Sequence, residues 1–543
     1  MKRFLNVLVF LVPQRVRRGL LMRLLSLLKQ KLKSDLQSEL IVELKKEILI
    51  NIDITINQAI MRQRALPRKV ESFLTHIDSL LAHQNDLDEA ARITKKLIVA
   101  WRVEIRRFAG LPDKTDKTAQ DLILEVSFLS ANAADLLPVF TKLRQKTVLF
   151  AGQAYYNAWY LSRALRLLGW DAFVLNWDED PKTQIYYHGE DFKTGSFDLK
   201  TDADCLSFYV ASIYDFEIFH FSNAHGISFG QRVSTIFNSH QFEANSEIRL
   251  LKYLGKKIIY SNNGCLDGVS QTAFSKWGTE SICSICVWRN VPSVCSDERN
   301  LGWGKFRNSV ADYQCLLGGN RIDYNEAGTV HEVPEFYCLD SNFWHPYLVI
   351  PSNFKLPEAN GVIRLYHAVA HKADRTSDDG VNIKSSHVYL PLMQRLVDEG
   401  LPLELIEPTG IPNKDVRYLQ AQADIFLEML SYGWFGANAR EAMMLGKPVI
   451  CYIRPEWLAS LREELPEYAD ELPIISATPD TVEGILRELI ANAEMRREVG
   501  ARSRVFAVKW HSSDAAGIRF DDIYSRLLQG DALLRQSVNK VIQ

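Results

Sequence analysis

The spacing of the hydrophobic positions changes near residue 146, and the two parts of the chain predict different structures. Before that point apolar residues recur every four positions, as at Leu32, Leu36, Leu40 and Leu44, with charged and amide side chains between them. This spacing is that of an amphipathic helix. After it, short β-type apolar runs alternate with helical stretches, which is typical of parallel sheets in α/β domains.

The α/β pattern occurs twice. The first set of predicted strands covers residues 147–151, 171–176, 215–221 and 256–260. Helices are predicted between them at 154–168 and 243–254. The second set of predicted strands covers 362–366, 403–406, 424–427 and 448–452. The helices predicted in and after this second set cover 385–398, a stretch ending at 422, 437–445 and 480–528.

We therefore predict an α/β fold with two facing Rossmann-like domains, preceded by a mostly α-helical N-terminal region. The expected parts are a helical or coiled-coil-like region 1–118, a helical linker 119–145, a first domain 146–350, a second domain 351–512 and a C-terminal helix 513–543. Ligands in open α/β sheets bind at the carboxyl ends of the strands. Two such sheets predict a cleft between the domains and an enzyme with two substrates.

Composition is that of an ordinary globular protein. Of the 543 residues 47% are apolar and 24% are charged, and the formal net charge is −2. These values exclude a disordered chain, a collagen and a small disulfide scaffold. Because the chain lacks the basic excess of a nucleic-acid binder, we expect no nucleic-acid partner.

The charge is unevenly distributed, since residues 1–34 carry nine Lys and Arg and no carboxylate. The apolar run 4–12 is shorter than the roughly 20 residues that span a bilayer. Arginines follow it instead of a small-residue cleavage site. We expect a cytoplasmic protein, with residues 1–34 a candidate for peripheral contact with the inner face of the membrane. The helical stretch 15–64 is interpreted as packed on neighbouring helices, as a self-associating coiled coil or as a membrane-surface helix.

The most informative segment is 423–450. A predicted strand ends near Leu427, and a loop with Gly433 and Gly436 lets the backbone approach a ligand closely. A helix is predicted to begin at Ala437. Its free N–H groups and its dipole suit a phosphate group.

This segment resembles the signature of the retaining, nucleotide-sugar-dependent glycosyltransferases with the GT-B fold (group 1, family 4-like). The matching residues are Asp424, Phe435, Gly436, Glu441, Ala442, Met443, Gly446, Lys447, Pro448, Val449 and Ile450. The resemblance covers roughly 147–530 and is strongest over 362–453. It implies transfer of a sugar, with retention, from a UDP-, GDP- or ADP-sugar to a glycan or lipid-linked acceptor, as in the synthesis of cell-surface polysaccharides. The nucleotide sugar is a co-substrate, and no cofactor is required.

The resemblance also implies roles for individual residues on the donor side. Glu441 would bind the ribose, and Glu428 would face the sugar; these two are the candidate catalytic residues. The donor-binding residues would be Arg375, Lys384, Gly433, Gly436, Ala437, Asn438 and Glu441. Gly433 stands where the family has the first of two glutamates, so the donor sugar stays open.

On the acceptor side the resemblance points to the loops that follow the first set of strands. The candidates there are Gly152, Tyr155, Asn157, His225 and Asn263. Asn263 stands where many relatives have a histidine. In a retaining reaction in which the nucleotide leaves from the front face, the leaving phosphate takes the proton, so this difference does not exclude activity.

Four cysteines have an irregular metal-like spacing. Cys283, Cys286, Cys295 and Cys315 are a weak candidate for a structural zinc site. We favour unpaired thiols in an insertion on the acceptor side and predict no metal. The aromatic and arginine residues of the same insertion suit a sugar or anionic acceptor, or an irregular core.

Two other functions stay open. Gly433 and Asn263 favour a non-catalytic GT-B-like module that binds a nucleotide sugar or a glycan. A nucleotide-sugar epimerase is the second alternative, and it would need no acceptor.

Overall fold

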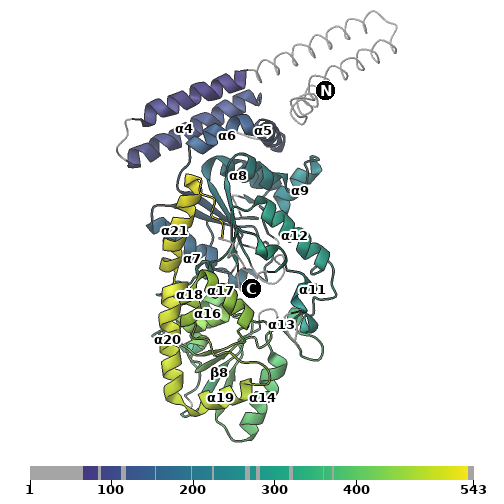
Figure 1. The fold of residues 1–543 in the computed structure, drawn as a ribbon, viewed down its shortest axis with the longest axis vertical. Coiled ribbons are helices and arrows are strands. Elements are labelled where there is room, and N and C mark those ends of the chain that lie inside the picture. The colour runs from purple at the N-terminus through teal and green to yellow at the C-terminus, as the bar shows by residue number, and fades with distance from the viewer. Residues whose placement is uncertain are drawn as a thin grey trace, which may run out of the picture. The chain divides into compact units, whose positions relative to one another are not determined.

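The computed structural model (Figure 1) describes residues 65–82, 87–111, 118–152, 155–196, 199–222, 226–262, 269–276, 282–316, 322–358, 360–369 and 372–535. These residues form two compact units. The first unit takes the described residues of 1–145, 197–217 and 231–256, and the second takes the remainder. The basic segment 1–34 and the predicted helix 15–64, with its membrane contact and self-association, lie outside the described residues.

The first unit is helical. After a helix over residues 65–81, its helices are α4 (Leu87–Phe108), α5 (Ala119–Ala131), α6 (Ala133–Lys142), α8 (Asp202–Asp215), α9 (Gln231–Ser239) and α10 (Ser246–Tyr253). A buried carboxylate ties three of them together, because Glu125 accepts hydrogen bonds from Arg106 at 2.8 Å and from the hydroxyl of Tyr214 at 3.0 Å. Such a buried charge is stable only when it is paired.

No single helix among the described residues is long and apolar enough to cross a membrane. Helices α5 and α6 satisfy the length and composition test only together, as a pair bent by 92°.

The second unit contains two parallel sheets. The first has seven strands in the order β3-β2-β1-β4-β5-β6-β7. The strands are β1 (Thr147–Ala151), β2 (Asp171–Asn176), β3 (Phe192–Lys193), β4 (Ile218–Phe221), β5 (Lys257–Ser261), β6 (Tyr313–Leu316) and β7 (Val330–Glu332). In register, Val148 of β1 lies opposite Ala172 and Ile218. Every residue of β1 is buried, which explains why this strand appears in the sequence as a continuous apolar run.

The second sheet has four parallel strands in the order β11-β10-β8-β9. Its strands are β8 (Ile363–Tyr366), β9 (Leu403–Ile406), β10 (Ile425–Leu427) and β11 (Val449–Ile450). The helices of this part are α13 (Lys372–Arg375), α14 (Ser386–Asp398), α15 (Asn413–Gln420), α16 (Ala437–Met444), α17 (Pro455–Glu464), α18 (Pro466–Glu471) and α19 (Val482–Ala491).

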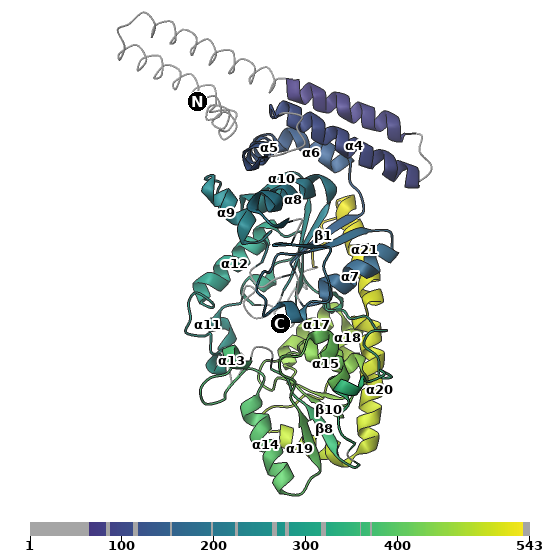
Figure 2. The same ribbon diagram turned by 180° about the vertical axis from the view of Figure 1, so that it is seen from behind.

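Two C-terminal helices connect the second sheet with the first. Helix α20 (Ala493–His511) packs against α16, and α21 (Ser513–Gln529) packs against α7 (Asn157–Leu167), which follows β1. Both helices run along one side of the second unit in Figure 1 and Figure 2. Gly517 of α21 allows the close contact, since a Cβ there would lie 2.9 Å from the Cβ of Ala164.

This architecture confirms the predicted fold class, an α/β fold with two Rossmann-like parallel sheets and a helical N-terminal region. The predicted domain boundaries stay predictions. One predicted strand is partly wrong: β4 begins at Ile218, because helix α8 extends to Asp215. Helix α8 begins with a capping box in which Thr201 and Asp204 bond each other's backbone N–H groups, and this signal is present in the sequence. Helix α12 (Asp297–Val310) and strands β6 and β7 were also missed.

Candidate functional site

A cavity of about 440 Å³ lies in the second unit, where loops that follow strands of both sheets meet. Tyr155 and Asn157 reach it from the segment after β1. Met429 and Gly436 reach it from the segment after β10. These are carboxyl ends of parallel strands, where open α/β sheets bind ligands.

The cavity brings together ten of the candidate site residues that the sequence predicted. They are Tyr155, Asn157, Cys283, Cys286, Cys295, Arg375, Lys384, Gly436, Ala437 and Asn438. Glu428, Glu441, Gly433, Gly152 and Cys315 do not line it. His225 and Asn263 lie outside the described residues.

Gly152 shapes the loop after β1 rather than the cavity wall. Its φ angle is +90°, a conformation that glycine adopts without strain. Its N–H donates to the carbonyl of Leu175 at 2.9 Å, and its own carbonyl accepts from the hydroxyl of Ser222 at 3.2 Å.

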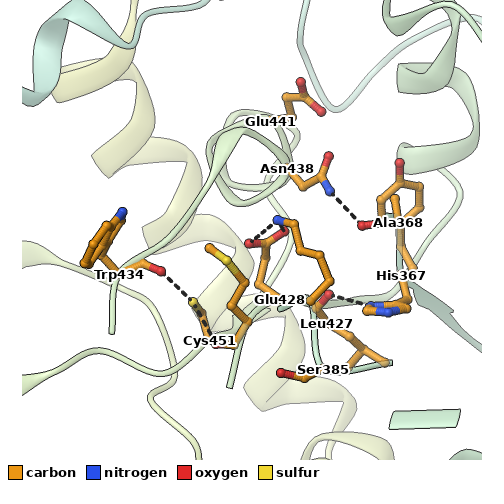
Figure 3. A network of polar contacts seen from close by, with 12 residues as sticks. His367, Ala368, Ser385, Leu427, Glu428, Trp434, Asn438, Glu441 and Cys451 are labelled. Carbon is orange, nitrogen blue, oxygen red and sulfur yellow. Dashed lines mark hydrogen bonds and ion pairs between the residues drawn. The ribbon is translucent and has the colours of Figure 1, made fainter. Parts of the chain in front are cut away.

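Lys384 and Glu428 form an ion pair at the wall of the cavity (Figure 3). The ammonium of Lys384 donates to both carboxylate oxygens of Glu428, at 2.9 and 3.0 Å. Glu428 is 1% exposed, and the hydroxyl of Tyr389 donates to its backbone carbonyl at 2.8 Å. Since an ammonium has three donors, one of the donors of Lys384 stays available to the cavity that it lines.

The first turn of α16 lies beside this ion pair. Gly436 is the N-cap and has no side chain that could bond the free N–H groups of the turn. A Cβ on Gly436 would lie 3.3 Å from Nζ of Lys384. The helix N-terminus and the ammonium together offer donors and positive charge at one point, which suits a phosphate group.

Glu441 is fully buried one turn into α16 and accepts hydrogen bonds from three side chains. Oε1 accepts from the hydroxyl of Tyr156 at 2.8 Å and from Nδ2 of Asn413 at 3.1 Å. Oε2 accepts from Nε2 of Gln420 at 2.6 Å. Burial raises the pKa of the Glu441 carboxyl, while these three donors act to lower it. The carboxylate therefore faces its partners and not the cavity.

The hydrogen bonds continue from Glu441 to the segment before β3 and to helix α7. Oδ1 of Asn413 lies 2.8 Å from Nε2 of His188, whose Nδ1 lies 2.6 Å from the hydroxyl of Tyr160. Burial lowers the pKa of His188 to about 4, so the ring is neutral at pH 7. Because Nδ2 of Asn413 donates to Glu441, its Oδ1 must accept from the Nε2–H of His188. The Nδ1 of His188 then accepts from Tyr160.

The sequence did not reveal this network. Tyr156 is adjacent to the predicted Tyr155, but its partner lies 285 positions away in the chain. His188, Asn413 and Gln420 belong to no motif. No signal in the sequence could have found them, because tertiary packing alone brings them together.

Gly433 has a backbone conformation that favours glycine. Its φ angle is +96°, and a Cβ there would lie 3.0 Å from the Cβ of Arg454. The carbonyl of Gly433 accepts from the N–H of Arg454 at 2.8 Å. A glutamate at this position would strain the loop, so the loop is built around glycine.

The four candidate cysteines are not brought together as a zinc site. None of the seven cysteines that the structure describes forms a disulfide. Cys283, Cys286 and Cys295 line the cavity, whereas Cys315 lies in β6 within the core. In the described part of the chain, no three or more His, Cys, Asp or Glu side chains are grouped so that they could hold a metal ion. Burial raises the pKa of the Cys286 thiol, so the thiol stays protonated at pH 7.

Comparisons with known proteins find similarity in structure only. The sequence matches no protein-family model and no curated protein. Sucrose-phosphate synthase from Thermosynechococcus elongatus has a TM-score of 0.43 and 15% identity, over 72% of this chain and 100% of its own. A glycosyltransferase from Rickettsia africae has a TM-score of 0.42 and 11% identity, over 71% and 99%. HepE from Anabaena, solved in complex with UDP-glucose, has a TM-score of 0.41 and 11% identity, over 70% and 99%.

Proposed function

We propose that this protein is a glycosyltransferase that moves a sugar from a nucleotide-sugar donor to an acceptor held beside the first sheet, with retention. The observation that carries this proposal is the meeting of Lys384 with the N-terminus of α16 at a cavity formed by the carboxyl ends of both sheets. A diphosphate fits this point in charge and in hydrogen bonding.

The diphosphate is also the leaving group. Negative charge grows on its outer phosphate as the bond to the sugar breaks. Lys384, Arg375 and the α16 N-terminus line the cavity and supply fixed positive charge. Charge that is already in place when the transition state forms lowers the barrier without reorganisation.

Glu441 binds the ribose in this proposal, after an exchange of hydrogen bonds. The carboxylate now accepts from the hydroxyl of Tyr156 and the amide of Asn413. The two ribose hydroxyls offer equivalent donors, so they replace these partners without leaving the carboxylate unpaired. Asn413 already lines the cavity, which makes it the nearer of the two to a bound nucleotide.

The proton of the acceptor hydroxyl goes to the leaving phosphate. Among the described residues that line the cavity, none is Asp, Glu or His, the usual general bases. A phosphate oxygen on the same face of the sugar accepts the proton, which gives retention. Glu428 pairs with Lys384 in this arrangement, and it acts on the sugar only through that ammonium.

Incubation of the protein with UDP-, GDP- and ADP-sugars, with and without acceptor glycans, tests the proposal. We expect slow hydrolysis of one donor class and transfer of the sugar when an acceptor is present, and NMR of the product should show the donor's anomeric configuration. Release of an altered free sugar with no acceptor requirement would instead identify an epimerase. Nucleotide-sugar binding without turnover would identify a binding module.

The location of the protein is a separate part of the proposal. We place it in the cytoplasm, with residues 1–34 contacting the inner membrane face, where lipid-linked acceptors lie. One short basic segment supplies only weak, reversible attachment. Removal of residues 1–34 should release the protein from the membrane fraction, and unchanged fractionation would contradict the membrane contact.

A further inference from the structure

The side chains around the cavity carry one sign of charge. Among the described lining residues, Arg289, Arg375, Lys384 and Arg440 are basic and none is acidic. The positive charge of Lys384 is balanced by Glu428 just behind it. Lys384, Arg375 and the α16 N-terminus are the groups proposed to bind the two negative charges of a nucleoside diphosphate sugar. Arg289 and Arg440 are cations beyond that set.

Arg440 is the most unusual of these residues, because it is 4% exposed. Its guanidinium makes no hydrogen bond or ion pair with any residue that the structure describes, and its Nε is buried without a partner. It lies over the rings of Tyr337, at 5.0 Å, and Phe435, at 6.0 Å. Glu332 lines an adjoining small cavity with it but makes no ion pair with it, and Glu441 is bonded to three other donors.

A buried charge without a partner is costly, and proteins normally pair it or bond it fully. Aromatic faces attract a guanidinium but do not satisfy its N–H donors. Arg440 also lines the main cavity, so a bound molecule can supply the acceptors. A carboxylate or phosphate matches a guanidinium through two parallel hydrogen bonds.

Arg440 reaches toward the acceptor side. It projects from α16, but Tyr337 belongs to the segment after β7 of the first sheet. The hydroxyl of Tyr337 donates to the carbonyl of Asn262, directly after β5. The guanidinium thus lies against Tyr337, which follows a strand of the first sheet, and Phe435, which follows a strand of the second.

Arg289 supplies a second cation on that side. It lies in the segment between α11 (Gln271–Phe274) and α12, next to Trp288. Nε2 of Gln271 donates to the carbonyl of Arg289 at 2.9 Å and holds this backbone in place. Trp288 and Tyr186 line the cavity here and offer flat apolar faces of the kind that small-molecule sites use.

We infer that the acceptor carries an oxyanion, a carboxylate or a phosphate, that pairs with Arg440 and Arg289. This inference rests on the proposed function, because it places an acceptor in the same cavity as the donor. Lys384, Arg375 and the α16 N-terminus serve the donor diphosphate, and the two remaining arginines serve the acceptor. Acidic sugars, such as uronic acids, and sugar phosphates both have this chemistry.

Ligand titrations in the presence of a saturating nucleoside diphosphate test the inference. The probes are glucuronate, galacturonate and glucose 1-phosphate, with glucose and galactose as matched neutral sugars. We expect the anionic sugars to bind at least tenfold more tightly than their neutral counterparts. Tighter binding of the uronates alone identifies a carboxylate, and tighter binding of glucose 1-phosphate alone identifies a phosphate. Either result supports the inference.

Two variants test whether Arg440 and Arg289 bind the anionic sugar. Arg440→Met removes a buried unpaired charge, so this variant should fold, and Arg289→Gln alters an exposed side chain. Each should weaken the binding of the anionic sugar at least tenfold and leave the nucleotide Kd unchanged. Arg497→Gln on the exposed face of α20 is the control and should change neither.

Three results would overturn the inference: equal affinity for anionic and neutral sugars, anion binding that survives both substitutions, or anion binding that saturating nucleotide abolishes. The last result would place the anion in the diphosphate site. Failure of the proposed function gives a different result, because the wild-type protein then binds no nucleotide. The sugar titrations are then repeated without nucleotide and judged by the same tenfold criterion.

Discussion

The hydroxyl of Tyr156 donates a 2.8 Å hydrogen bond to Oε1 of Glu441 and so joins the segment after β1 to helix α16. Both residues are at most 1% exposed. The bond is one of three at this carboxylate, and the chain of partners continues through Asn413 to His188. The two sheets of the second unit are therefore connected through one buried acid, which is also the residue proposed to bind ribose.

Replacing the hydroxyl of Tyr156 distinguishes an effect on stability from an effect on nucleotide binding. Tyr156→Phe leaves one oxygen of Glu441 with a single donor, which should lower the free energy of unfolding by about 1–3 kcal/mol. The nucleotide Kd should stay the same or fall, since a ribose hydroxyl takes the place of this donor. Urea unfolding and calorimetric titration measure the two effects. A Kd more than threefold weaker would mean that Tyr156 contacts the nucleotide itself.

The ion pair of Lys384 and Glu428 predicts a non-additive double substitution. Lys384→Met leaves a buried carboxylate, 1% exposed, without its cation, which should cost about 3–5 kcal/mol of stability. Adding Glu428→Gln removes the stranded charge and should restore most of that loss. Nucleotide affinity should stay low in both variants, because the cation is absent from both. Recovery of affinity along with stability would contradict a direct role for Lys384.

Gly436 tests the N-terminus of α16 directly. A methyl group there would lie 3.3 Å from Nζ of Lys384 and 3.5 Å from Oε2 of Glu428, at the N-cap of the helix. Gly436→Ala should weaken nucleoside diphosphate binding about tenfold, or about 1.4 kcal/mol. The matched control is Gly484→Ala in α19, where nothing lies within 4 Å of the added carbon. The control should keep the wild-type Kd and gain up to about 1 kcal/mol of stability. Equal Kd values in the two variants would exclude a phosphate at α16.

Three buried histidines predict how stability depends on pH. Burial lowers the pKa of His188 to about 4 and those of His220 and His511 to about 3. An unfolded histidine titrates near pH 6.5, so below that pH the unfolded chain binds more protons than the folded one. The stabilisation is complete above about pH 6.5 and is lost as pH falls toward the folded pKa values. Each of these histidines contributes up to about 1.4 kcal/mol per pH unit to this loss between pH 6 and 5.

Substitution of one histidine isolates its share of this loss. His188→Gln should reduce the slope of unfolding free energy against pH by about 1 kcal/mol per pH unit between pH 6 and 5, and urea unfolding at several pH values measures the slope. Substitution of the exposed His76 serves as the control. An unchanged slope in His188→Gln would mean that His188 is not held neutral in the folded protein.

The sequence predicted the strands and the helix that surround the site better than the side-chain contacts within it. Strands β1, β2 and β9 were predicted with the observed bounds, because each is a short apolar run between turn signals. Helix α16 begins at Ala437, as its glycine-rich approach indicates. These features are local, so local patterns are sufficient to predict them.

The partners of the two glutamates could not be predicted in this way. Glu428 was expected to face a sugar and instead pairs with Lys384, itself expected at the diphosphate. Glu441 was expected at the ribose and is enclosed by Tyr156, Asn413 and Gln420. Burial and pairing depend on segments up to 285 positions apart, and no periodicity in the sequence records such contacts.

Calorimetric titration with UDP, GDP and ADP tests the central claim most directly, because that claim is a nucleoside diphosphate site at α16. We predict that at least one of the three binds with a Kd in the micromolar range, about −8 kcal/mol at 1 μM. Arg375→Gln and Gly436→Ala should each weaken that binding about tenfold, while Arg497→Gln on α20 should leave it unchanged. Absence of binding for all three nucleotides, or equal affinity in all three variants, would contradict the account.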